Sequence, residues 1–140
     1  MKKKTDLVCV NETFLNQSIE DIASEGYAVV GRRDRCDGRA GGGIAAFALT
    51  SIQERVTLAS KAEVAERMWL LVHAEQGPHL VGVWYRPPSP GEVNSVTTFQ
   101  TELQGLADLA IGSISIGDFN VHNQQWLFAI PIMTAQTEGR

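Results

Sequence analysis

Two carboxylates stand where apolar segments of the chain end. Glu12 closes "DLVCVNE", and Asp118 follows "SISIG" within the stretch "IGDFNVHNQQW". Side chains alternate along a strand, so each carboxylate shares a face with the apolar residues two and four positions before it. If the two strands are neighbours in one sheet, both carboxylates emerge at the rim of a core. Magnesium takes one or two protein carboxylates and leaves its other positions to water and phosphate.

On the pattern alone, the simpler interpretation is favoured: acidic residues often sit where strands leave the core for water. The same two interpretations apply to Asn120 and His122, which follow Asp118 directly. A plain loop can use such residues, and so can a site that handles phosphate with a metal ion.

Tyr85 is the last member of the alternating set Val81, Val83 and Tyr85 in the strand "HLVGVWYR", which ends just before the proline pair Pro87 and Pro88. Proline cannot donate to a sheet ladder, so the strand must end here. A tyrosine fixed at this point could present its hydroxyl to a cleft. Packing at the mouth of the core is the interpretation that the pattern alone favours.

Other motifs give weaker signals. The glycine-rich "GRAGGGIAAF" fits a dinucleotide fingerprint by spacing, but no amphipathic helix follows it, so a β-hairpin is favoured. Arg32, Arg33 and Arg35 of "RRDR" could face phosphate, although solvated strand ends are commoner. His73 is expected to be a core histidine. No zinc spacing, phosphate-binding loop or nucleophile elbow occurs.

The elements that must position these residues follow from periodicity. Alternation and β-branched runs predict strands, and Val96, Phe99 and Leu103 belong to a face with helical spacing. Many strands with two helices predict a mixed α/β (α+β-like) sandwich. The expected strands are 6–12, 27–35, 41–49, 54–58, 67–75, 79–86 and 113–117, and the expected helices are 16–26 and 93–110. The segments 67–75 and 79–86 should form an antiparallel hairpin.

The whole chain has 140 residues and a net charge of −4, which predicts one domain and no general attraction to nucleic acid. The two cysteines do not form a disulfide framework, and Cys9 lies in an apolar run typical of a core. No secretory signal or membrane-length run is present, so an intracellular, soluble protein that does not engage membranes is expected.

Taken together, several stretches resemble one family. "VCVNETFL", "GYAVVGRRDRCDGRAGGGIAAF", "MWLLV", "VGVWYRPPSPGE" and "IGDFNVHNQQW" occur in the order found in the endonuclease/exonuclease/phosphatase superfamily. The nearest branch is the endonuclease domain of non-LTR (LINE-type) retrotransposon reverse transcriptases. "GDFN" alone is a moderate signal, but "YRPP", a helix and then "GDFN", with "ET" and "RRDR…GGG" upstream, is a specific combination.

The resemblance implies a two-sheet sandwich flanked by helices and magnesium-assisted hydrolysis of phosphate esters, with manganese as a possible substitute. It implies that Glu12 binds the metal and that Asp118 orients or deprotonates the attacking water. It further implies that Asn120 holds the scissile phosphate and that Tyr85 stabilises charge developing there. His122 receives no role from the resemblance, and neither do the arginines of "RRDR".

The likeness covers about residues 6–127, so a partial domain is expected over 1–127 and a divergent tail over 128–140. The family pattern also includes an earlier strand and a later "SDH" stretch, which do not occur in this sequence. The expectation is therefore an incomplete domain, truncated at both ends, that is weakly active or inactive.

DNA is the expected ancestral substrate, and the reverse transcriptase domain of a parent element is a possible partner. Two alternatives remain. One is a non-catalytic remnant or interaction fragment of the same fold, and the other is a phosphatase-type enzyme acting on a small phosphate ester.

Overall fold

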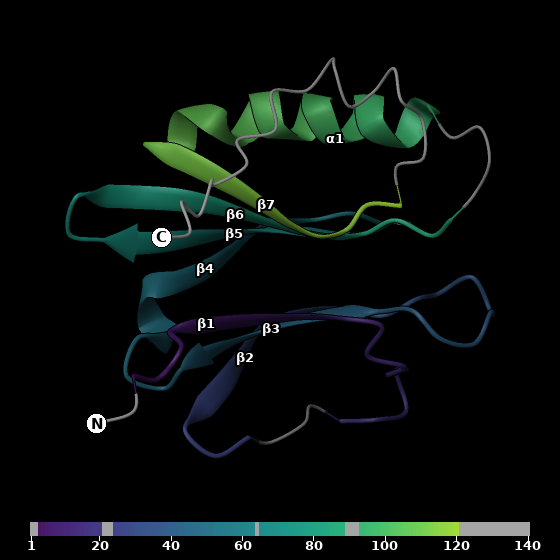
Figure 1. The fold of residues 1–140 in the computed structure, drawn as a ribbon, viewed down its shortest axis with the longest axis horizontal. Helices are drawn as coiled ribbons and strands as arrows, with labels where there is room; N and C mark the ends of the chain where they lie inside the picture. Colours follow the sequence, from purple (N-terminus) through teal and green to yellow (C-terminus); the bar gives the residue numbers. More distant parts are fainter. Residues whose placement is uncertain (1–2, 21–23, 64, 89–92, 121–140) are drawn as a thin grey trace, which may run out of the picture.

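The computed structural model describes residues 3–20, 24–63, 65–88 and 93–120 as two β-sheets and one long helix (Figure 1). The first sheet has the order β1-β3-β2, and both of its strand pairs are antiparallel. Its strands are β1 (Leu7–Asn11), β2 (Tyr27–Arg33) and β3 (Ile44–Leu49).

The second sheet has the order β4-β5-β6-β7. Strands β5 and β6 form the expected antiparallel hairpin, whereas β7 runs parallel to β6. Parallel neighbours need a crossover connection, and the long helix provides it. The strands are β4 (Val56–Lys61), β5 (Glu66–Ala74), β6 (Gly77–Tyr85) and β7 (Gly112–Asp118); the helices are α1 (Val93–Leu106) and the short 3₁₀ segments η1 (Gln53–Arg55) and η2 (Ala107–Leu109).

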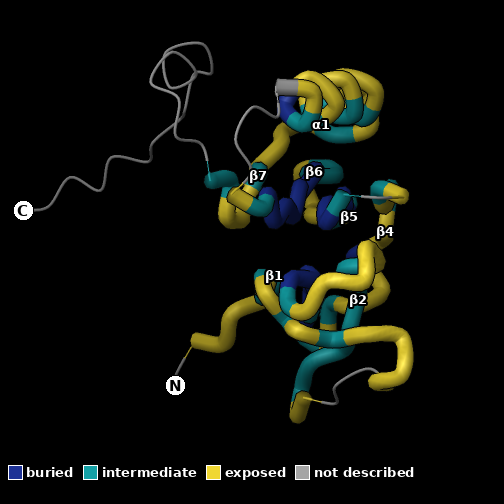
Figure 2. Tube along the Cα trace, turned by 90° about the vertical axis from the view of Figure 1, so that its right-hand side faces the viewer, coloured by how far each residue is buried: buried dark blue, intermediate teal, exposed yellow. Residues whose placement is uncertain are grey.

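The two sheets face each other, and α1 covers the outer face of the second sheet (Figure 1). The expected mixed two-sheet architecture with few helices is thus present. The buried residues gather between the sheets and around β5 and β6 (Figure 2). The core between the sheets contains Ile44, Ala46, Ala48, Val56, Met68, Leu70, Val81, Val83 and Tyr85. Ala46 and Ala48 of β3 have small side chains, so the two sheets can pack closely there without leaving voids.

The outer face of the second sheet is aromatic. Phe99 of α1 stacks on Trp84 and Trp69, with ring centroids 4.9 Å and 5.3 Å away. Beside this stack, Arg67 is buried and donates from Nε and Nη2 to the Glu102 carboxylate, at 2.6 Å and 2.9 Å. The apolar face of α1 therefore packs on the sheet, as its helical spacing predicted.

Two local predictions were wrong. The helix expected over 16–26 is not formed in its described part, where Ile19 N–H donates to Asn16 O in a turn and Ser24 makes a bridge. The Asn16 side chain accepts from Ser18 N–H at 2.9 Å, and such side-chain bonds compete with helix. His73 is exposed near the end of β5, with Nε2 3.4 Å from Thr57 Oγ1, and is not a core residue.

Cys9 is half-buried against the core, and burial raises the pKa of its thiol to about 11. Among the described residues, no helix combines the length and apolar character needed to cross a membrane. The domain boundary expected at 127 and the tail 128–140 lie outside the described residues.

Candidate functional site

Glu12 and Tyr85 meet where the two sheets face each other. The hydroxyl of Tyr85, at the end of β6, donates to Oε1 of Glu12 at 3.0 Å. Tyr85 is buried, whereas Glu12 is exposed, so the pair lies at the boundary between the core and solvent. The bond spans the sandwich, because β1 and β6 belong to different sheets.

The backbone after β1 holds Glu12 in an unusual conformation. Glu12 has a φ of 53°, a left-handed value that is uncommon for a residue with a Cβ. The next two residues are tied to the glycine-rich loop before β3: Thr13 N–H donates to Gly43 O and Phe14 N–H to Gly42 O. The "GGG" stretch therefore serves as a backbone partner for the segment that carries Glu12.

Asp118 lies beside Tyr85 in the second sheet. The two residues are paired in the parallel ladder of β6 and β7, so their side chains point to the same face. Gly117 permits this approach, since its φ is 145° and a Cβ there would collide with the carbonyl oxygen of Trp84. Both carboxylates predicted from the sequence are consequently neighbours of one phenol.

Arg86, the residue after β6, helps to hold Asn120 next to Asp118. Its Nδ2 donates to Arg86 O at 2.7 Å, and its backbone N–H donates to Oδ1 of Asp118 at 3.2 Å. The buried Arg86 returns hydrogen bonds from Nη1 to the carbonyl oxygens of Phe119 and Asn120. Its Nε donates to Ser95 Oγ of α1 at 2.9 Å, so the loop is fastened to the helix as well.

An ion pair between Arg35, which follows β2, and Glu66 of β5 supports Tyr85. The Arg35 guanidinium lies 5.7 Å from the centroid of the Tyr85 ring and pairs with Glu66, with 3.2 Å between Nε and Oε1. Glu66 is buried and accepts from Gly43 N–H at 2.6 Å. A cation over an aromatic face is attractive, so Arg35 helps to fix the ring.

The Tyr85 phenol is a hydrogen-bond donor at neutral pH. Burial raises its pKa above the ordinary value of 10.0, the Glu12 carboxylate raises it further, and the Arg35 guanidinium opposes both effects. A neutral phenol can donate to a carboxylate or to a phosphate oxygen.

The donor set suits a hard divalent cation. Carboxylate oxygens are the protein ligands that Mg²⁺ prefers, and it commonly uses one or two of them. Glu12 is exposed and Asp118 is exposed, so both can reach a cation that keeps its own water. Within the described residues, no group of three or more His, Cys, Asp or Glu side chains could hold a metal ion. Any cation here would therefore rely on two carboxylates, water and substrate.

One premise of the sequence interpretation was wrong. The strands before Glu12 and Asp118 are not neighbours in one sheet, since β1 is an edge of the first sheet and β7 is an edge of the second. The two strands instead face each other across the sandwich, and Tyr85 connects them through its bond to Glu12 and its pairing with Asp118.

Sequence reasoning missed two supporting residues, Glu66 and Arg86, and it considered Arg35 only as a residue that could face phosphate. A signal existed for Arg86, since it follows Tyr85 in "YRPP" and alternation directs it to the opposite face, where α1 lies. Glu66 gave no such signal, because its partners are 23 and 31 positions away in sequence. His122 lies outside the described residues.

No model of a protein family, no curated protein and no solved structure matches this chain.

Proposed function

We propose that this chain is a magnesium-dependent phosphodiester hydrolase of the endonuclease/exonuclease/phosphatase type that nicks DNA, similar to the endonuclease domains of non-LTR retrotransposons. The observation that supports it best is the meeting of Glu12, Tyr85 and Asp118, which are far apart in the sequence. Asn120 joins them through its bond to Asp118. These are the residues to which the sequence resemblance assigns chemical roles.

In this proposal each side chain has a distinct task. Glu12 holds the cation, which would supply charge neutralisation at the phosphate. Asp118 orients a water molecule and accepts its proton, because a carboxylate is an acceptor when ionised. The amide of Asn120 donates to a phosphate oxygen, and the hydroxyl of Tyr85 donates its single proton to another once Glu12 has turned to the cation; negative charge grows on these oxygens in the transition state.

The activity should be low. In the described part of the chain no histidine contacts the cluster: His73 lies near the end of β5 beside Thr57, and His79 is near the start of β6, away from Tyr85. The family pattern has a phosphate-contacting histidine in an "SDH" stretch that this sequence does not contain, and one such donor to a charged transition state commonly contributes on the order of 100- to 1,000-fold in rate. We therefore expect slow, magnesium-dependent nicking that is visible only at high protein concentration.

The decisive experiment is nicking of supercoiled plasmid by the 140-residue chain with and without Mg²⁺. Asp118→Asn should abolish the slow nicking, whereas the matched change Asp108→Asn, at an exposed residue of η2, should not. The same comparison applies to Glu12→Gln against Glu54→Gln in η1. Nicking that survives in Asp118→Asn would come from a contaminant or from another site, and would overturn the proposal.

A non-catalytic role of the same fold is the second candidate, because the cluster as described lacks a third metal ligand. Binding of Mn²⁺ tests whether a cation site exists at all, which both candidates allow and a chain without a site does not. Paramagnetic Mn²⁺ should broaden the NMR signals around Glu12 and Asp118 in the wild type but not in the double variant Glu12→Gln, Asp118→Asn. Broadening without any nicking favours the non-catalytic role.

Substrate class is tested in the same preparation. A phosphodiesterase should hydrolyse bis(p-nitrophenyl) phosphate faster than p-nitrophenyl phosphate. The reverse order would support an enzyme that acts on a small phosphate monoester.

A further inference from the structure

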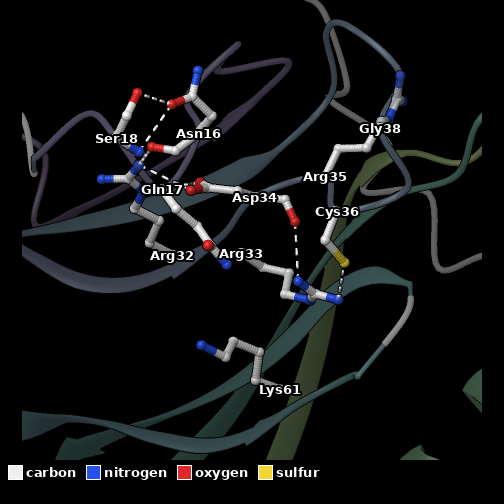
Figure 3. Close-up of a pocket in the computed structure, with 10 residues that line it drawn as sticks. All are labelled: Asn16, Gln17, Ser18, Arg32, Arg33, Asp34, Arg35, Cys36, Gly38 and Lys61. Carbon is white, nitrogen blue, oxygen red and sulfur yellow. Dashed lines mark hydrogen bonds and ion pairs between the residues drawn. The ribbon is translucent and has the colours of Figure 1, made fainter.

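A basic pocket opens beside the candidate site, at the end of β2 (Figure 3). It has a volume of about 630 Å³ and lies between the loop 16–18, the end of β2 with the turn after it, and Lys61 of β4. Its basic residues are Arg32, Arg33, Arg35 and Lys61, and its one acidic residue is Asp34. The excess of positive charge is local, because the whole chain carries −4.

Two of the four cations already have a carboxylate partner. Arg32 pairs with Asp34, with 2.8 Å between Nε and Oδ1, and Arg35 pairs with Glu66. Arg33 hydrogen-bonds to neutral acceptors only, among the residues that the structure describes. Lys61 is exposed, and its side-chain ammonium makes no hydrogen bond or ion pair with the described residues. Two charges in the pocket thus remain without a counter-charge at hydrogen-bond distance.

Arg33 is fixed in place before any ligand arrives. Its Nε donates to Ala62 O at 2.8 Å, its Nη1 to Asp34 O at 3.0 Å, and its Nη2 to Glu63 O and to Cys36 Sγ. These bonds tie the end of β2 to the segment after β4 and account for the arginine's orientation. They leave its positive charge uncancelled, and a half-buried charge is screened less by salt than an exposed one.

The pocket also offers uncharged donors. The side chain of Gln17 reaches from the loop toward Arg33 (Figure 3), while the hydroxyl of Ser18 on the same rim donates to Asn16 Oδ1. Lysine, amide and hydroxyl groups together are typical ligands of phosphate oxygens. The volume exceeds that of a single phosphate group, so the pocket can admit a phosphate that carries further atoms.

Arg35 connects this pocket to the candidate site. It lines the pocket, and its guanidinium also lies over the ring of Tyr85, which bonds to Glu12. A ligand that occupies both places would put one phosphate at the candidate site, next to Tyr85. It would put a second phosphate in the pocket, beyond Arg35. A small ester with a single phosphate group has no second phosphate to offer, whereas a polynucleotide carries one at every link.

We propose that this pocket binds a non-scissile backbone phosphate of a polynucleotide, held by Lys61, Arg33 and the Gln17 amide. Phosphate binding here follows from the pocket alone, whereas the assignment to a polynucleotide substrate rests on the proposed function. The substrate of the candidate site is then a nucleic acid chain and not an ester with a single phosphate group.

The test is binding without chemistry. Fluorescence anisotropy in EDTA with a labelled single-stranded oligonucleotide should show about 10-fold weaker binding for Lys61→Glu, and a salt slope smaller by about 1. Gln17→Glu, a near-isosteric change, should weaken binding in the same direction. The matched control is Lys4→Glu, which makes the same charge change. Lys4 lies near Gly26, just before the start of β2, whereas the pocket is at the other end of that strand. Thermal melting confirms that each variant is folded.

Inorganic phosphate separates the two sources of a phosphate group. In the wild type it should shift the NMR signals of residues 16–18 and 32–36, and Lys61→Glu should remove the shifts. Shifts with phosphate but no Lys61-dependent oligonucleotide binding would overturn the assignment to a polynucleotide. Equal weakening by Lys4→Glu and Lys61→Glu, or no binding of either probe, would overturn the pocket itself.

Failure of the proposed function gives a different result. If the chain never nicks DNA, yet its oligonucleotide binding depends on Lys61 and Gln17 and not on Lys4, the phosphate pocket stands and only the hydrolase proposal falls. If Asp118-dependent nicking occurs but is insensitive to Lys61→Glu at limiting DNA concentration, the hydrolase stands and the pocket is not part of its substrate path.

Discussion

The hydroxyl of Tyr85 donates to Oε1 of Glu12 at 3.0 Å, across the interface between two sheets that share no strand. The sequence separation is 73 residues, so the contact exists only because both sheets are folded and packed. Tyr85 is also the pairing partner of Asp118 in the second sheet, so one residue links the Glu12 carboxylate to the strand that carries Asp118.

Tyr85→Phe should lower the free energy of unfolding by about 1 kcal/mol, because it removes one hydrogen bond whose acceptor is exposed. Urea unfolding measures the change. The matched control is Tyr27→Phe, which also removes one hydroxyl bond, from Tyr27 to Thr5 O at 2.9 Å, but away from the site. If only Tyr85→Phe reduces magnesium-dependent nicking while both variants lose similar stability, the Tyr85 hydroxyl acts in the reaction. A similar loss of nicking in both variants would indicate a structural effect.

The ionisation of Tyr85 should make stability depend on alkaline pH. Burial, and then the Glu12 carboxylate, raises the pKa of the folded phenol above the 10.0 of an unfolded tyrosine. The unfolded state therefore loses its proton first, and the stability that this shift contributes is complete below pH 10 and falls as pH rises through the folded pKa. The chain has only two tyrosines, so absorbance titration of Tyr27→Phe reports Tyr85 alone. A phenol that titrates below 10 in the folded variant would contradict the assigned environment.

Glu102→Gln should be more destabilising than an ordinary surface change. Arg67 has a side chain only 2% exposed, and Glu102 accepts from both Arg67 and Trp69 Nε1. Removing one partner of a buried pair leaves an uncompensated charge and typically costs about 3–5 kcal/mol. Since Glu102 is 25% exposed and glutamine still accepts one bond, we expect about 2 kcal/mol.

The control for Glu102→Gln is Asp37→Asn, which breaks the exposed Arg39–Asp37 pair. Its effect should be clearly smaller than that of Glu102→Gln, because solvent screens an exposed ion pair. Thermal or urea unfolding compares the two, and equal effects would show that the Arg67–Glu102 pair is no stronger than a surface ion pair.

The outer edge of β7 should promote self-association. In the described residues β7 pairs only with β6, and Ile114 is 59% exposed on this edge strand. An exposed apolar edge invites pairing with another chain, and lysine there discourages it. Ile114→Lys should shift sedimentation toward monomer at high protein concentration. Ile19→Lys, the same change in a loop, should not. If both variants behave alike, net charge and not the edge controls association.

The sequence by itself determined which segments are strands, which face of the long helix packs, and which residues could do chemistry. These are local properties: alternation, helical spacing and proline after a strand depend on neighbouring residues. The same local logic failed over 16–26, because side-chain bonds at Asn16 compete with helix and no periodicity reports them.

Only the tertiary structure decided how the carboxylates meet. Alternation places Glu12 and Asp118 on defined faces of their strands, but it cannot say which strands are neighbours, since that depends on how the sheets pair and pack. Strands β1 and β7 belong to different sheets, and the contact between the sheets at this point is the hydrogen bond from the buried Tyr85 to Glu12. The supporting pair of Arg35 and Glu66 was hidden for the same reason: 31 residues separate them, and a buried ion pair forms only when the fold removes both groups from water.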